Sequence, residues 1–190
     1  MNWLALALAA WIFLALELSL KAGLALGDST IAPSFLFVLL TLIAMSAPAR
    51  TSTWTALALG LAMDLTFEIP LKAGGPPATV VGPYALSYVL GVQLILALRG
   101  IMIRRNPLTL GFLAMVGLAV AQVTLVAIFS IRSFYDPIFW EPARELWVRL
   151  ASCVYTGIVG AILGLVMIPF SPLLGLGNAG ATARATTRRP

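Results

Sequence analysis

The stretch PLTLGFLAMVGLAVAQVTLVAIFSI, from Pro107 to Ile131, carries no charged side chain. The hydrocarbon core of a bilayer is roughly 30 Å thick, and a helix needs about 20 consecutive apolar residues to cross it. Apolar and polar residues do not alternate along this stretch, as they would in the strands of a membrane barrel. The stretch therefore predicts a membrane-spanning helix.

The rest of the chain repeats this pattern. Of its 190 residues, 61% are hydrophobic and 10% are charged, whereas soluble domains carry about 25% charged residues. Proline opens two of the apolar segments, after Ala32 and after Asn106, as suits a first helical turn. We predict an all-α transmembrane domain over residues 1–173, a bundle of six helices spanning about 3–22, 31–47, 53–67, 79–98, 107–131 and 146–170.

The basic residues predict how this bundle is oriented. Cytoplasmic loops of membrane proteins are rich in Lys and Arg. With six spans, both termini and two of the connections share one side. Seven basic residues fall there and five on the other side, and Arg99, Arg104 and Arg105 share one tight loop. We therefore place both termini in the cytoplasm, and we expect residues 174–190, rich in Gly, Ala, Thr and Arg, to be a disordered basic tail.

Several kinds of chemistry are excluded by the composition. The chain has no His, and Cys153 is its single cysteine, so disulfides and Cys/His metal sites cannot form. The seven Asp and Glu residues leave only a carboxylate metal site formally open. Catalytic triads and Gly-rich phosphate loops are missing from the sequence. We expect no catalytic, cofactor or metal residues, no enzyme activity and no nucleic-acid binding. The net charge of +5 suits contact with anionic lipid instead.

A polar cluster is predicted near the outer ends of the helices. Glu17 and Asp64 are ionisable residues inside predicted spans, where each costs at least about 2.5 kcal/mol on insertion scales. Tyr84 and Tyr88 share a face of the next helix, and a Tyr hydroxyl is a donor for a buried carboxylate. Arg149 is a candidate counter-ion for Glu17 or Asp64. We interpret the cluster chiefly as helix-packing contacts; a proton or substrate site is the alternative.

Two further surfaces are candidates for packing or for partners. Gly157, Gly160 and Gly164 place small residues along the last span, which allows close backbone approach either inside the bundle or with a partner helix. Trp140 and Trp147 belong to an aromatic-rich outer region. Aromatic residues gather at the headgroup level, so an interfacial belt is favoured there over a docking surface.

One region of the chain resembles a known family. Gly60-Leu61-Ala62-Met63-Asp64-Leu65 is followed by Gly82-Pro83-Tyr84-Ala85-Leu86-Ser87-Tyr88 and then by the basic loop Arg99 to Asn106. In this order and spacing the motifs resemble the rod shape-determining protein MreD, a small bacterial inner-membrane protein. The Gly- and Pro-rich turn from Gly74 to Gly82 and the arginine tail depart from the commoner pattern of that family.

The resemblance implies a non-catalytic scaffold role. Proteins of the MreD family act with the bitopic protein MreC and the cytoskeletal protein MreB, in machinery that also holds the glycosyltransferase RodA and penicillin-binding protein 2. Their fold is similar to the substrate-binding component of energy-coupling-factor transporters. The alternative is therefore a membrane subunit that binds a vitamin, with Glu17, Asp64, Tyr84 and Tyr88 lining an outward-facing pocket. A proton-coupled transporter is a third possibility.

Overall fold

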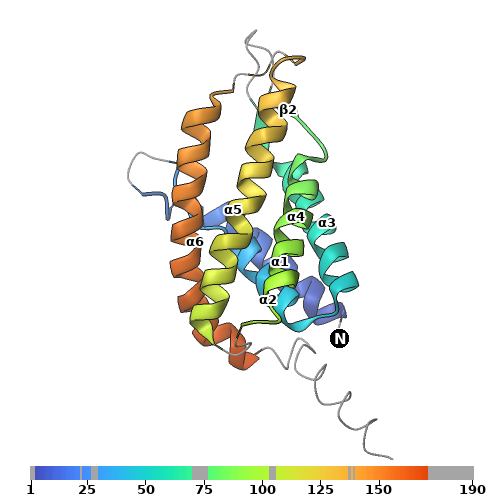
Figure 1. The fold of residues 1–190 in the computed structure, drawn as a ribbon, viewed down its shortest axis with the longest axis vertical. Helices are drawn as coiled ribbons and strands as arrows, with labels where there is room; N and C mark the ends of the chain where they lie inside the picture. Colours follow the sequence, from blue (N-terminus) through green and yellow to red (C-terminus); the bar gives the residue numbers. More distant parts are fainter. Residues whose placement is uncertain are drawn as a thin grey trace, which may run out of the picture.

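A computed structural model describes residues 3–21, 23–26, 30–69, 77–102, 106–136, 138 and 140–170. Within these residues the regular secondary structure is helical, apart from one short strand pair (Figure 1). The elements follow in the order α1 (Trp3–Leu20), α2 (Phe35–Ser46), α3 (Ala49–Thr66), β1 (Glu68–Ile69), β2 (Ala78–Thr79), α4 (Pro83–Leu98), α5 (Pro107–Arg132) and α6 (Pro142–Phe170). The predicted tail at 174–190 and two of the predicted cytoplasmic arginines, Arg104 and Arg105, lie outside the described residues.

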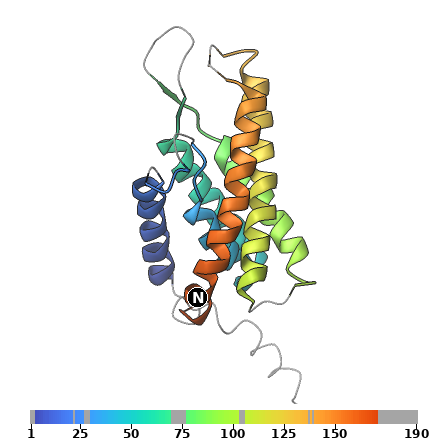
Figure 2. The same ribbon diagram turned by 90° about the vertical axis from the view of Figure 1, so that its left-hand side faces the viewer.

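The helices run alternately up and down a single bundle (Figures 1 and 2). Successive helices α3, α4, α5 and α6 pack side by side, and the main contact of α1 is with α2. The N-terminal end of α1, the α2–α3 junction, the α4–α5 junction and the C-terminal end of α6 lie at one end of the bundle. The antiparallel β1–β2 pair, in which Glu68 faces Thr79, lies at the other end.

Two helices, α5 and α6, are long and apolar enough to cross a membrane. Helix α5 begins at Pro107, where the side chain of Asn106 caps it by accepting the N–H of Leu108 at 2.9 Å. Helix α6 begins at Pro142, four residues before the predicted start of the last span. Proline has no N–H to leave unpaired in a first helical turn, and this explains both starting points.

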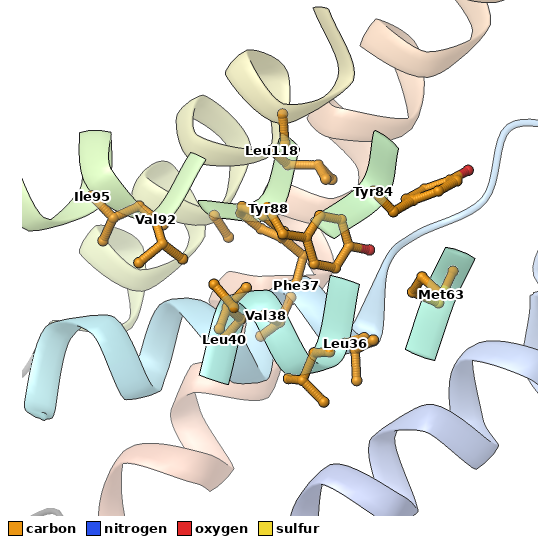
Figure 3. Close-up of a cluster of buried hydrophobic side chains, with 14 of the residues drawn as sticks. Leu36, Phe37, Val38, Leu40, Met63, Tyr84, Tyr88, Val92, Ile95 and Leu118 are labelled. Atoms are coloured by element: carbon orange, nitrogen blue, oxygen red, sulfur yellow. The ribbon is translucent and has the colours of Figure 1, made fainter. Parts of the chain in front are cut away.

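Helix α2 differs from the span predicted at 31–47. Its 12 residues extend only about 18 Å, so the helix by itself is shorter than a bilayer core is thick. Every residue from Phe35 to Met45 is buried, and α2 contacts each of the other helices. It is therefore the central core helix of the bundle. Figure 3 shows Phe37 of α2 beside Tyr88 of α4, with ring centroids 5.3 Å apart in an edge-to-face arrangement.

Candidate functional site

A polar cavity lies where α1 and α3 end and where α4 and α6 begin. It has a volume of about 310 Å³, which is at the lower end of the range for small-molecule sites. Four of the five residues predicted to form the polar cluster line it: Glu17, Tyr84, Tyr88 and Arg149. The remaining polar lining comes from Lys21, Thr30, Ser34, Gln122, Glu145 and Ser152.

Glu17 of α1 holds the beginning of α2. Its side chain is buried and accepts the backbone N–H of Leu36 at 3.1 Å. Lys21, the residue that follows α1, brings its Nζ to 4.0 Å from the other carboxylate oxygen. A carboxylate at a helix N-terminus is stabilised by the free N–H groups and by the helix dipole. The first predicted carboxylate is thus a cap supplied by a neighbouring helix.

Asp64 of α3 does the same for α4. Its side chain is fully buried, and its two oxygens accept the N–H groups of Gly82 at 2.8 Å, Tyr84 at 2.8 Å and Ala85 at 3.2 Å. Gly82 has a φ of 118°, a value that glycine adopts without steric cost. The predicted partner of this carboxylate, the Tyr84 hydroxyl, is wrong: the donors to Asp64 are backbone N–H groups, and the hydroxyl of Tyr84 accepts from Arg149 instead. Asp64 also does not line the cavity.

Arg149 of α6 is at the centre of a different network. Its Nε donates to Glu145 at 3.0 Å, and its Nη1 donates to Gln122 at 2.9 Å and to the Tyr84 hydroxyl at 3.3 Å. Its guanidinium carbon lies 5.6 Å from the ring centres of both Phe67 and Trp140. The prediction that Arg149 pairs with Glu17 or Asp64 is therefore wrong. Glu145 lies one helical turn before it, at the favourable i, i+4 spacing.

Arg99, which was predicted only as a basic residue of a cytoplasmic loop, also forms hydrogen bonds within the bundle. Its Nη1 donates to the carbonyl oxygens of Ala44 at 2.8 Å and Ala47 at 2.7 Å. These carbonyls end α2, where a cation complements the negative end of the helix dipole. Helix α2 is therefore capped by a carboxylate from α1 at its beginning and by the guanidinium of Arg99, the residue after α4, at its end.

The small-residue face of α6 packs inside the bundle. A Cβ on Gly157 would lie 2.9 Å from Cβ of Met115, and one on Gly164 would lie 3.2 Å from Cα of Pro107. Gly160 is looser, with Cγ2 of Val38 at 3.3 Å from its hypothetical Cβ. Of the two alternatives for this face, the structure places the contact within the chain, chiefly against α5.

The two predicted tryptophans differ in their surroundings. The ring of Trp140 lies 5.0 Å from that of Phe129, and its Nε1 donates to Ser130 at 3.3 Å. Trp147 has 76% of its surface exposed. Trp140 thus contributes to the wall behind Arg149, whereas Trp147 is free to contact lipid or a partner.

Some residues of the site were not predicted. Ser152 and Thr156 of α6 accept the backbone N–H groups of Ala32 at 3.4 Å and Ser34 at 2.9 Å, in the non-helical segment before α2. Gln122 is the only amide side chain in the stretch from Pro107 to Ile131, so its polarity was a usable signal. Ser152 and Thr156 gave no comparable signal, because hydroxyls in helices commonly bond to their own backbone.

Hydrogen bonds and ion pairs connect the described polar side chains around the cavity. No group of three or more His, Cys, Asp or Glu side chains is placed among them to hold a metal. Cys153 is buried, and its Sγ lies 3.1 Å from the carbonyl oxygen of Arg149. Comparison of the chain with protein-family models, with curated proteins and with solved structures finds no match.

Proposed function

We propose that the chain is a multi-pass membrane protein of the bacterial inner membrane. Large apolar side chains are exposed on the outside of α1, α3 and α6, among them Leu4, Trp11, Leu65 and Leu165, whereas Glu17 and Asp64 are buried. This distribution suits a protein whose outer surface faces lipid. A bilayer also explains why the non-helical backbone at 32–34 is buried, with hydroxyls of α6 accepting the N–H groups of Ala32 and Ser34.

The six predicted crossings are compatible with the short helix α2. Helix α2 covers about 18 Å, and the five residues at 30–34 reach at most about 17 Å when extended. Together they are long enough for the second crossing, as a broken element inside the bundle. Both termini are then cytoplasmic, on the side of Arg50 and Arg99.

Within that membrane we propose a non-catalytic scaffold of the cell-elongation machinery. It would bind MreC and link MreB to peptidoglycan synthesis by RodA and penicillin-binding protein 2. The observation that carries this proposal is that the two halves of the MreD-like motif meet. Gly60 lies against Ala85, and Asp64 accepts three N–H groups at the beginning of α4. The motif residues thus form one structural unit.

Purification of native complexes tests the proposal. The chain, tagged at its N-terminus and expressed at its normal level, is extracted from its own membranes in mild detergent. We expect MreC to co-purify and rod-shaped cells to round up when the chain is depleted. An ATPase module with its transmembrane coupling subunit, in place of MreC, would show that the chain is instead the vitamin-binding subunit. Recovery of neither set would also overturn the scaffold proposal.

A further inference from the structure

The cavity is larger than packing contacts require. Its volume of about 310 Å³ falls within the range of roughly 300–1,000 Å³ that is usual for small-molecule sites. Its walls come from α1, from the segment before α2, and from α3, α4, α5 and α6. The cavity is partly open to the outside, so a small molecule can enter it.

The charges around the cavity are balanced. Two acids and two bases line it, paired as Glu17 with Lys21 and Glu145 with Arg149. In each pair one side chain is more deeply buried. Glu17 is 2% exposed beside Lys21 at 48%, and Arg149 is 12% exposed beside Glu145 at 37%. The deep part of the cavity therefore has an anion on the α1 wall and a cation on the α6 wall.

We propose that the cavity binds a small zwitterionic group, with its ammonium toward Glu17 and its anionic part toward Arg149. A ligand with a single charge would leave one of these buried groups without a ligand partner, and an apolar ligand would desolvate both. Tyr84, Tyr88 and Gln122 add neutral polar groups to the walls. Two sources supply this chemistry: a free solute of amino-acid or dipeptide size, and the headgroup of phosphatidylethanolamine. The site does not depend on the partners proposed above.

Binding to the purified full-length chain tests the site and identifies the source. The chain is placed in nanodiscs of phosphatidylglycerol alone and titrated with glycylglycine, acetate or methylammonium, and binding is followed by equilibrium dialysis and thermal unfolding. In a second arm, phosphatidylethanolamine is added to the nanodiscs. Saturable binding of glycylglycine identifies a solute site, and stabilisation by phosphatidylethanolamine alone identifies a headgroup site. Failure of both, or binding of acetate or methylammonium as tight as that of glycylglycine, would overturn the proposal.

A charge reversal separates ligand binding from stability. Lys21→Glu changes the balance of the four charges from zero to −2, at a side chain that is half exposed and therefore compatible with folding. We expect zwitterion binding to weaken about tenfold and methylammonium to bind. The matched control is Arg132→Glu, which removes a base paired with Asp136 at 2.8 Å outside the cavity. Equal effects of the two variants, or no change in ligand selectivity, would contradict the proposed site.

Discussion

Asp64 shows how a charged side chain can be stable inside an apolar bundle. Its two carboxylate oxygens receive three backbone N–H groups at the beginning of α4. Those N–H groups have no partner within their own helix, so the charge and the free donors satisfy each other. The geometry explains why a carboxylate, and not a neutral side chain, occupies this position.

Asp64→Asn is expected to destabilise the protein while keeping its shape. One carboxylate oxygen becomes an NH₂ group, which places a donor against at least one backbone N–H. We expect a loss of about 2 kcal/mol in the free energy of unfolding, measured as a lower thermal midpoint in detergent. The control is Asp136→Asn, whose half-exposed ion pair with Arg132 is worth at most about 1 kcal/mol. Equal shifts of the thermal midpoint for both variants would show that the Asp64 cap adds no more stability than an exposed ion pair.

Residue-level prediction succeeded for the charged residues and failed for their partners. Glu17 and Asp64 were identifiable because an ionisable group in an apolar segment needs a reason. Their partners are backbone N–H groups, which every sequence position carries and which no residue type reveals. Arg99 illustrates the same limit, since its contact with the end of α2 depends on tertiary packing across more than 50 positions of the chain.

At the scale of elements, caps and prolines made the long helices predictable. The predicted and observed beginnings of α5 coincide at Pro107, because Asn106 and Pro107 are both local signals. The burial of α2 inside the bundle was not predictable in the same way. An apolar segment that is buried by protein and one that faces lipid have the same composition, and only the packing of the other helices distinguishes them.

Glycine residues determine how closely the helices pack, and the contact of Gly60 with α4 is an example that can be tested by substitution. A Cβ on Gly60 would lie 2.5 Å from Cα of Ala85 and 2.8 Å from the backbone oxygen of Tyr84. Backbone atoms cannot move aside without separating α3 from α4. We therefore expect Gly60→Ala to lower the free energy of unfolding by about 2–3 kcal/mol, measured by thermal unfolding in detergent.

Gly160→Ala is the matched control for this contact. Its Cβ would meet a side-chain methyl of Val38 at 3.3 Å and Cα of Gly111 at 3.4 Å, so a shift of a few tenths of an ångström suffices. Alanine also gains up to about 1 kcal/mol of helix propensity at either site. The two variants therefore differ only in what the new methyl group meets. A loss of stability at Gly160 as large as that at Gly60 would contradict this ranking.

At the scale of the whole molecule, the alternating course of the helices separates two ends. Gly100 follows α4 at the end where α1 begins, and Tyr135 follows α5 at the opposite end. Both are accessible: Tyr135 is 85% exposed, and a Cβ on Gly100 would have no neighbour within 4 Å. If the bundle spans the inner membrane with cytoplasmic termini, these two positions face different compartments.

Labelling with a membrane-impermeant thiol reagent distinguishes the compartments. In cells with a permeable outer envelope, we expect Tyr135→Cys to be labelled directly and Gly100→Cys only after the inner membrane is opened. The unsubstituted chain is the control, because its one thiol, on Cys153, is buried and is expected to stay unlabelled in both conditions. The reverse pattern would invert the orientation. Direct labelling at both positions would mean that α5 does not separate two compartments, which contradicts the membrane topology on which the scaffold proposal depends.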